Sequence, residues 1–378
     1  RRGRPRWKRS RGVAAAALNL PDEIVVWEIF LRLPSKDILR CRAVCRTWRG
    51  LTSAHDFLRA HHRRQPSLPL VTLYGEISNE GALPFPERGR PVLGFDDHER
   101  FRLLASFDGL LLVYLSDGRY SICNPTTRDC APLPSLTAAG SIDVLALYLH
   151  GPSGEYRVLY WKEASYYILF VRRGRSGRCI GVPSDTPDIK KVMLASGGMT
   201  PYAPPIVFRN CLHWHPGVLH NNVSSIVVFD TVVESFRFMR CPDGETGFRT
   251  RLCDMEGSIG FSCFDDVATV VKIWLLEDYE REVWSFKYHV KLPVQSLRDI
   301  GDIRHLVLSN KGDVLVYSCS KGYMFHCDST GKLLEEFRCD PWSLSIIGHS
   351  FKESLVKHDI SLRRGCGCVK QLRFFQRV

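Results

Sequence analysis

The stretch LPDEIVVWEIFLRLPSKDILRCRAVCRTWRGL, residues 20–51, decides how the N-terminal part of this chain folds. Pro21 suits the first turn of a helix, and Asp22 follows where the helix dipole favours an acid. The first segment stops at Pro34, and Ser35 can then cap a second helix. The stretch therefore predicts two helices separated by a proline.

The second predicted helix has one apolar face. At 100° per residue, its apolar side chains fall within an arc of about 140°, beside a separate stripe of arginines. The apolar residues are Ile38, Cys41, Val44, Cys45, Trp48 and Leu51, and the arginines are Arg42, Arg46 and Arg49. The segment SAHDFLRAHH (53–62) predicts a further short helix. A bundle of about forty residues has a small core, so it gains from a partner.

After residue 65 the apolar period changes from that of a helix to that of a strand. Short β-branched and aromatic runs, broken by Gly, Asn, Asp and Pro, continue for about 295 residues. Examples are LVTLY (70–74), GLLLVYL (109–115), YRVLYW (156–161), SIVVFD (225–230), TVVKIWLL (269–276) and VLVYSC (314–319). No long helix interrupts these runs, so they predict an all-β domain.

A weak repeat explains the size of this domain. Comparable strands begin near residues 109, 155, 210, 267 and 313, about 51 residues apart. Four strands per unit of that length predict a kelch-like β-propeller of six blades, within a range of five to seven. Polar turns follow at Asn124, Asp230 and Asp328, whose side chains can bond the backbone ahead. WSLSIIGHSFKESLVKH (342–358) is expected to supply a closing strand.

The net charge of +12 is concentrated at one end of the chain. Residues 1–64 hold 16 Lys and Arg against 5 Asp and Glu, and seven of these basic residues lie among the first twelve. This distribution leaves open the alternative that the chain is a nuclear protein that binds nucleic acid through residues 1–64, although nucleic acid is the less favoured partner. No apolar run approaches the length of a membrane span, and no secretory signal pattern follows the basic start.

The 14 cysteines are scattered and none stands in a CxxC spacing, which favours a reducing compartment, cytoplasmic and/or nuclear. Cys41 and Cys45 could share a helical face as zinc ligands, but a site needs four ligands and no second pair is suitably spaced. No metal, cofactor or catalytic residue is therefore predicted. Other histidines, cysteines and tryptophans that could suggest a site are expected to pack in the interior or lie at a rim. They are His61, His62, His213, His215, Cys366, Cys368, Trp161, Trp214, Trp274 and Trp284.

Residues 20–57 resemble the F-box. The resemblance rests on Leu20-Pro21, EIFLRLP (28–34), Lys36-Asp37, RAVCRTW (42–48) and Leu51. The first helix is one residue longer than the commonest form of the motif, which leaves the pairing of Ile24 to Trp27 open. The resemblance implies that a Skp-type adaptor is bound through Leu20, Pro21, Ile24, Ile29, Leu33, Pro34, Ile38, Val44, Cys45, Trp48 and Leu51, some of them F-box core.

The β region resembles the F-box-associated domains of large plant families, through SFDGLLLVY (106–114), CNPTTRD (123–129) and HSFKESLV (349–356). The two resemblances imply a non-enzymatic substrate receptor of a cullin-based ubiquitin ligase, with cullin and RING subunits reached through the adaptor and an unknown protein as substrate. An F-box protein that binds the adaptor without the cullin is the other alternative. The expected organisation is α plus all-β: a basic leader 1–18, an F-box domain 19–62, a β-propeller 63–360 and a basic tail 361–378.

Overall fold

A computed structural model describes most of the chain and divides it into two compact units, Arg1–Gln65 and Pro66–Val378. The described residues are 20–73, 81–84, 101–115, 117–127, 129–137, 139, 142–172, 177–181, 204–214, 225–242, 250–265, 269–292, 304–318, 321–338, 344–358 and 360. The predicted basic leader 1–18 and basic tail 361–378 lie outside these residues.

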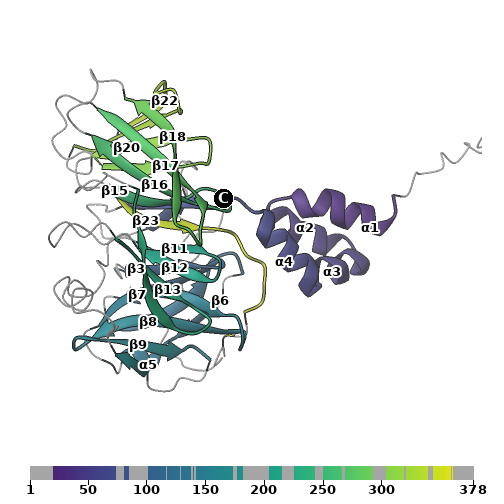
Figure 1. The fold of residues 1–378 in the computed structure, drawn as a ribbon. Helices are drawn as coiled ribbons and strands as arrows, with labels where there is room; N and C mark the ends of the chain where they lie inside the picture. Colours follow the sequence, from purple (N-terminus) through teal and green to yellow (C-terminus); the bar gives the residue numbers. More distant parts are fainter. Residues whose placement is uncertain are drawn as a thin grey trace, which may run out of the picture. The chain divides into compact units, whose positions relative to one another are not determined.

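The first unit is helical, as its sequence period predicts (Figure 1). Its elements are α1 (Asp22–Ile24), η1 (Val25–Ile29), η2 (Phe30–Arg32), α2 (Ser35–Val44), α3 (Arg46–Ser53) and α4 (His55–Arg64). Pro34 ends the first helical segment and directly precedes α2, because proline cannot continue a helix but fits just before or within its first turn. None of the described helices of the chain is long and apolar enough to cross a membrane.

The element η1 is a π-helical turn. The backbone N–H of Phe30 donates to the carbonyls of both Val25 and Val26, and the first of these bonds spans five residues. A π turn accommodates one more residue than an α turn. It therefore places one more residue in this part of the first helical segment than an α turn would.

The prediction of one continuous second helix through Leu51 is wrong. Helix α2 ends at Val44, and Cys45 is extended, with φ −152° and ψ 164°. The Cys45 Sγ then accepts a hydrogen bond from the Trp48 N–H and so caps α3. The helical-wheel seam that joined Ile38 to Leu51 does not exist, because the two halves of the stretch belong to helices with different directions.

The second unit consists almost entirely of strands, grouped in six sheets within the described residues. The closing sheet contains β1 (Leu68–Leu73), β2 (Gly81–Pro84) and β23 (Leu344–Phe351). The next two sheets contain β3 (Phe101–Phe107), β4 (Leu110–Leu115), β5 (Tyr120–Asn124), β6 (Asp129–Pro132), and then β7 (Asp143–His150), β8 (Glu155–Lys162), β9 (Ser165–Phe170), β10 (Arg178–Gly181). A short helix, α5 (Pro134–Thr137), lies between them in sequence.

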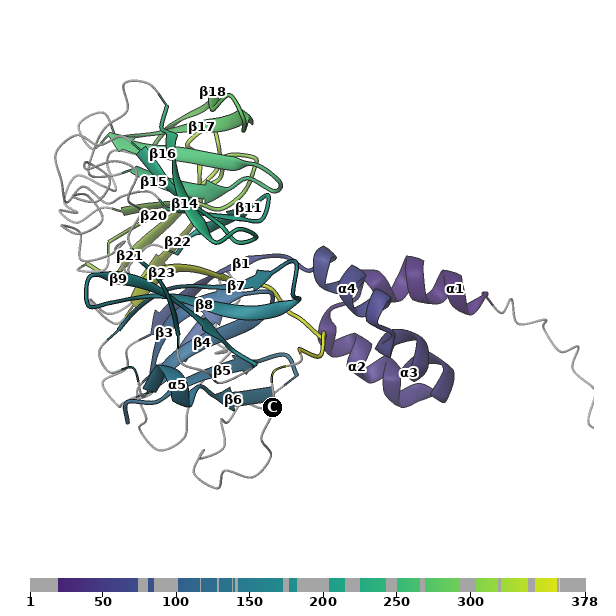
Figure 2. The same cartoon turned by 60° about the horizontal axis from the view of Figure 1, so that its bottom comes forward.

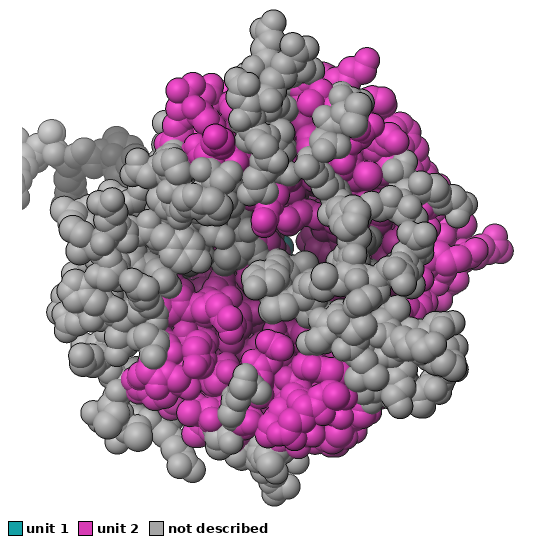
Figure 3. Space-filling model, turned by 90° about the vertical axis from the view of Figure 1, so that its left-hand side faces the viewer, with its two compact units in different colours: residues 1–65 teal, residues 66–378 magenta. Residues whose placement is uncertain are grey.

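The three remaining sheets follow the same plan of four consecutive antiparallel strands. They contain β11 (Ile206–Phe208), β12 (Cys211–Trp214), β13 (Ser225–Asp230), β14 (Ser235–Arg240); β15 (Thr250–Asp254), β16 (Ile259–Asp265), β17 (Val270–Asp278), β18 (Val283–Lys291); and β19 (Arg304–Val307), β20 (Val314–Ser318), β21 (Tyr323–Cys327), β22 (Leu333–Arg338). Five four-stranded sheets and a three-stranded closing sheet lie within the predicted range of five to seven blades. The predicted fold class, a small helical domain followed by a β-propeller, is confirmed. Figures 1 and 2 show the sheets arranged as blades, and Figure 3 shows the described parts of the unit around a small central opening.

Each inner strand is apolar on both faces because each sheet is packed on both sides. In β4, Leu110 and Leu112 pack toward sheet β7–β10, whereas Leu111 and Val113 pack toward the closing sheet. Side chains alternate along a strand, so a strand buried on both faces has a continuous apolar run such as LLLVYL. Similar clusters join each later pair of consecutive four-stranded sheets.

The repeat predicted from the sequence has the correct period but one error of phase. The strands starting near residues 109, 155, 210 and 313 are β4, β8, β12 and β20, each the second strand of its sheet. The strand near residue 267 is β17, the third strand of its sheet. The true equivalent, β16, reads IGFSCFD and is less aliphatic than its neighbour β17, VVKIWLLED.

The polar turns occur where the third strand of a sheet leads into the fourth. Asn124, Asp230 and Asp328 each accept backbone N–H bonds two residues ahead through Oδ1, as predicted. Asp278 does the same after β17, with bonds from Glu280 N and Arg281 N. This fourth turn follows β17 in the same place, after the third strand of the sheet order.

The end of the described chain closes the ring. Strand β23 pairs antiparallel with β1, which confirms the predicted closing strand. The segment after it then crosses sheet β3–β6, where the Asn124 amide donates to the Ser354 carbonyl at 3.0 Å. Gly109, at φ +78°, lies so close to Ser354 that a Cβ would come within 2.3 Å of the serine Cβ. The three motifs that resemble F-box-associated domains therefore meet at the ring closure.

Candidate functional site

The helical unit exposes a large share of the apolar side chains at the protein surface. Of thirteen large hydrophobic side chains exposed within the described residues, seven belong to the first unit. They are Leu20, Ile24, Trp27, Ile29, Leu39, Val44 and Leu51. Water does not favour such exposure, so a concentration of apolar side chains in one small unit indicates a surface that is covered by another molecule.

The structure separates the predicted docking residues by their exposure. Leu20, Pro21, Ile24, Ile29, Pro34, Val44, Cys45 and Leu51 are exposed, Leu33 and Trp48 are partly buried, and Ile38 is fully buried. Ile38 therefore belongs to the interior of the unit. The ring of Trp48 packs edge-on against Phe30 with centroids 4.8 Å apart, so it supports α3 as well as contributing to the surface. Direct contact of any of these residues with an adaptor stays a prediction.

Two exposed apolar residues were missing from the predicted set. Trp27 is 42% exposed and lies in the π turn, with its ring edge-on to Phe57 at 6.1 Å. Leu39 is 43% exposed on α2. Trp27 lies one turn after Ile24, so the two side chains lie near each other on the first helical segment.

The arginines of the second predicted helix do not form one stripe. Arg42 donates to the hydroxyl and the carbonyl of Thr52, at 3.2 and 2.6 Å, and so joins α2 to α3. Burial lowers the pKa of Arg42, and the group remains the donor of a structural contact. Arg46 and Arg49 are exposed on α3. The prediction of a separate stripe of three arginines is therefore wrong, because one of them is used inside the unit.

The histidines singled out in the sequence have structural partners where they are described. His61 is buried, with Nε2 2.8 Å from the Leu33 carbonyl, so it fixes α4 against the end of the first helical segment. His213 contacts the Ile206 carbonyl and the Tyr279 hydroxyl. His215 lies outside the described residues. Within those residues, no group of three or more His, Cys, Asp or Glu side chains is arranged to hold a metal ion.

Some polar contacts of the propeller join neighbouring sheets. The Glu234 carboxylate, in the turn after β13, accepts bonds from Arg157, Arg178 and Tyr148 of sheet β7–β10. Trp161 and Trp214 are buried between sheets β7–β10 and β11–β14. Trp274 and Trp284 are partly buried between sheets β11–β14 and β15–β18. These residues explain how the ring is held together, and none of them marks a reaction site.

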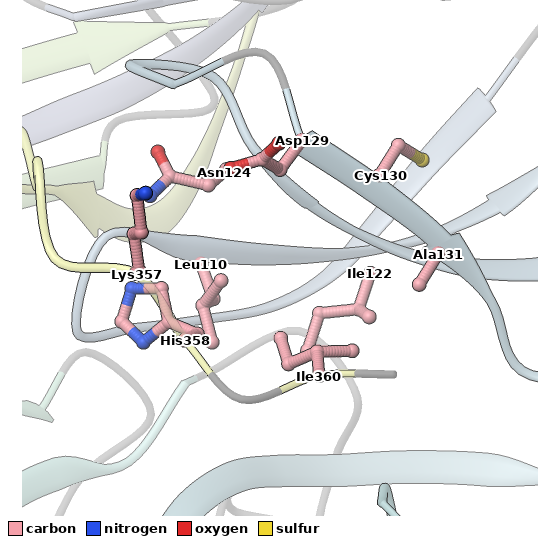
Figure 4. A pocket seen from close by; sticks show the side chains of 9 residues that line it. All are labelled: Leu110, Ile122, Asn124, Asp129, Cys130, Ala131, Lys357, His358 and Ile360. Carbon is pink, nitrogen blue, oxygen red and sulfur yellow. The ribbon is translucent and has the colours of Figure 1, made fainter. Parts of the chain in front are cut away.

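One cavity of about 240 Å³ lies in the propeller beside the ring closure. Leu110, Ile122 and Ala131 form its apolar wall, and Lys357 and His358 come from the segment after β23 (Figure 4). Cys130 lies next to Ala131 along β6. The His358 imidazole is fixed by the Tyr156 hydroxyl at 2.8 Å. The cavity has a mixed lining, with no pattern typical of a known reaction.

Comparison with known families agrees with both units. Residues 17–64 match the family described as F-box-like, and residues 93–340 match the F-box associated beta propeller domain, which is most of the chain. The chain belongs to the plant F-box proteins with an F-box-associated β-propeller. The comparison therefore confirms both resemblances, to the F-box and to the F-box-associated domain.

Curated relatives of this F-box protein come from Arabidopsis thaliana. F-box protein At5g49610 is 27% identical over 288 residues, covering 70% of this chain and 77% of the relative. Putative F-box protein At3g52320 is 23% identical, covering 79% and 80%, and Putative F-box/kelch-repeat protein At1g15680 is 26% identical, covering 73% of each.

Proposed function

We propose that this F-box protein is the substrate-recognition subunit of a Skp–cullin–F-box ubiquitin ligase. Residues 20–51 bind the Skp-type adaptor, and the propeller recruits a protein target for ubiquitination. The observation that carries the proposal is the concentration of exposed apolar side chains in the helical unit, seven of thirteen within the described residues. A helical surface of this kind fits an apolar groove on a partner, where a few anchors supply most of the affinity.

In this role the protein performs no bond chemistry. The adaptor links it to the cullin and RING subunits, and the propeller holds a lysine of the target near the activated ubiquitin. Tethering replaces a rare bimolecular encounter by a local one, so the rate gain comes from effective concentration. We further propose that the protein acts in the cytoplasm, the nucleus or both.

Exposed valines provide a direct test of adaptor binding. Val44 is 66% exposed in the helical unit, and Val233 is 68% exposed on the propeller. Val44→Gln should weaken binding of a recombinant Skp adaptor several-fold, and Val44→Gln with Ile24→Gln at least about tenfold, because uncompensated amide groups would be buried in the contact. Glutamine is a better helix former than valine, so α2 should be retained.

The control for this experiment is Val233→Gln, which makes the same change at matched exposure. Its adaptor affinity should equal that of the wild type. Affinity is measured by calorimetry, and circular dichroism confirms that each variant is folded. Wild-type affinity in the folded double variant would refute the docking assignment. Trp48→Ala with Leu33→Ala is a less direct test, because both side chains are partly buried.

A second experiment separates a ligase receptor from an F-box protein that binds the adaptor alone. The adaptor complex is mixed with cullin and RING subunits, and co-elution of all four proteins in gel filtration supports the receptor role. In cells, proximity labelling should detect proteins that accumulate under proteasome inhibition with the wild type but not with the double variant. Adaptor binding without cullin recruitment would contradict the receptor role.

A further inference from the structure

Two cysteines face each other across the outer pair of strands in sheet β3–β6. The register of β5 and β6 places Cys123 directly opposite Cys130. Directly opposed residues of antiparallel strands have Cα atoms about 4.5 to 5.5 Å apart, and disulfides span about 4.4 to 6.8 Å. The backbone therefore brings these two residues within disulfide range without any rearrangement of the strands.

The side chains confirm this proximity. The two Sγ atoms are 2.8 Å apart, in contact as thiols. Both side chains lie on the sheet face that packs toward the closing sheet, where Cys123 belongs to the buried cluster and Cys130 packs at its margin. Opposed residues on neighbouring strands share a face, so the thiol pair is a direct consequence of the register.

The two thiols differ in access, which gives them different roles. Cys123 is fully buried, whereas Cys130 is partly exposed. Cys130 is among the residues at the cavity of about 240 Å³, with its side chain directed away from those of Ala131 and Ile122 (Figure 4). Burial, together with the hydrogen bond to Cys130, raises the pKa of the Cys123 thiol. A reagent from solvent therefore reaches Cys130 first, and Cys123, in contact with it, is the thiol that reacts second.

We propose that Cys123 and Cys130 form a redox-active dithiol that is converted reversibly to a cross-strand disulfide by a small-molecule disulfide such as oxidised glutathione. The Cys130 thiolate attacks one sulfur of the reagent, and the first glutathione leaves as its thiolate. The Cys123 thiol then loses its proton and attacks the Cys130 sulfur, which releases the second glutathione. The dithiol is oxidised by two electrons, and one oxidised glutathione is reduced to two thiols.

The disulfide would close a ring over residues 123–130, which include the turn that begins at Asn124. Asn124 also holds the Ser354 carbonyl of the ring-closing segment. Oxidation would therefore fix the open edge of sheet β3–β6 and one wall of the cavity. This inference does not depend on the ligase role.

The proposal is tested on the full-length protein in buffers of graded reduced to oxidised glutathione ratio. After acid quenching and alkylation, trypsin cleaves between the two cysteines at Arg128 and gives the peptides 120–128 and 129–157. Mass spectrometry should detect these peptides joined by a disulfide, in a fraction that rises with the oxidised share and returns to zero with dithiothreitol. The urea-unfolded chain should give several-fold less of the joined product, because it lacks the register.

Variants identify the order of attack. Cys130→Ser should abolish the joined product, and Cys123→Ala should leave Cys130 trapped as a mixed disulfide with glutathione. Cys123→Ala replaces a buried thiol by a small apolar group, and circular dichroism establishes that the variant is folded. An absent joined product in the folded wild type, or equal yields from folded and unfolded chains, would overturn the proposal.

The chain contains its own control pair. Cys253 and Cys263 lie on the adjacent strands β15 and β16, but their register partners are Gly260 and Thr250. Both occur in the tryptic peptide 252–272, where a disulfide would leave the peptide without the two alkyl groups that the reduced thiols take up. This pair should remain reduced under conditions that link Cys123 to Cys130. Equal oxidation of both pairs would show that register does not direct the reaction.

Discussion

His213 and His349 are imidazoles buried inside the propeller. His213 donates from Nδ1 to the Ile206 carbonyl, since that carbonyl only accepts, and its Nε2 accepts from the Tyr279 hydroxyl at 2.9 Å. Burial, together with the charge of Arg237, lowers the pKa of His213 to about 4. Burial alone lowers the pKa of His349 to about 4. Both side chains are therefore neutral in the folded protein at neutral pH.

These two histidines should make the propeller sensitive to mild acid. In the unfolded chain their pKa returns to about 6.5, so that state binds more protons than the folded state between about pH 6.5 and 4. The free energy of unfolding should fall as the pH is lowered through this window, by on the order of 2–3 kcal/mol per histidine at pH 4.5. Urea unfolding at pH 7.5, 6.5, 5.5 and 4.5 measures this loss.

Substitution assigns the acid effect to one residue. His213→Gln should reduce the loss between pH 6.5 and 4.5 by about 2–3 kcal/mol, which is the share expected from this one group. His289→Gln, at an exposed position on β18, should leave the loss unchanged. Retention of the full pH effect in His213→Gln would contradict the assignment.

At the scale of the element, the turn between the third and fourth strands is the most regular feature of the sheets. The same Asx bonds recur after β5, β13, β17 and β21, although the sequences of these turns differ. Asn124 has a further role, because its amide also binds the Ser354 carbonyl after β23. One turn therefore helps to define its own sheet and to hold the ring-closing segment.

The double role of Asn124 predicts an unequal response to alanine. Asn124→Ala should lower the free energy of unfolding by about 2–4 kcal/mol, because a buried carbonyl and two turn N–H groups lose their partner. Asp230→Ala removes only the turn bonds and should cost about 1 kcal/mol. Chemical unfolding of both variants measures the difference. Equal losses would show that the bond to Ser354 contributes nothing.

At the scale of the whole molecule, the propeller depends on pairing between distant parts of the chain. Strand β1 pairs with β23 across almost the full length of the second unit. Without β23, the closing sheet would lose a strand and the edge of β1 would be unpaired, which favours opening and aggregation. The other sheets are each built from consecutive strands, so their pairing is local.

Truncation of the chain tests this closure. A protein that ends after residue 343 lacks β23 and the segment that contacts Gly109 and Asn124, and it should lose the cooperative thermal transition of the propeller. A protein that ends after residue 360 keeps every described strand and should retain that transition. Calorimetry with gel filtration measures both. A cooperative, monomeric product ending at residue 343 would contradict the role assigned to β23.

Much of this architecture could be predicted from the sequence because its signals are local. The helix period, the strand period, the repeat of about 51 residues and the turns at Asn124, Asp230 and Asp328 all depend on neighbours in the chain. The errors arose where local pattern was insufficient. The helical wheel continued through Cys45, because nothing in the pattern shows that this residue becomes extended and caps a new helix.

The docking residues were predicted only in part for a related reason. Apolar identity does not separate Ile38, which is buried, from Val44, which is exposed, although both were placed on one face. Trp27 was missed because its exposure depends on the π turn of the first helix. Burial depends on where the other helices lie, which is a property of the packed unit.

The sequence by itself determined the two units, the type of secondary structure in each and the family to which the chain belongs, because periodicity and turn chemistry act over a few residues. Only the tertiary structure decided where LPDEIVVWEIFLRLPSKDILRCRAVCRTWRGL is broken, which of its apolar side chains remain at the surface, and that Cys123 faces Cys130. The physical reason is that exposure and contact across strands depend on segments brought together by packing, and a linear pattern does not specify the register or the angle at which they meet.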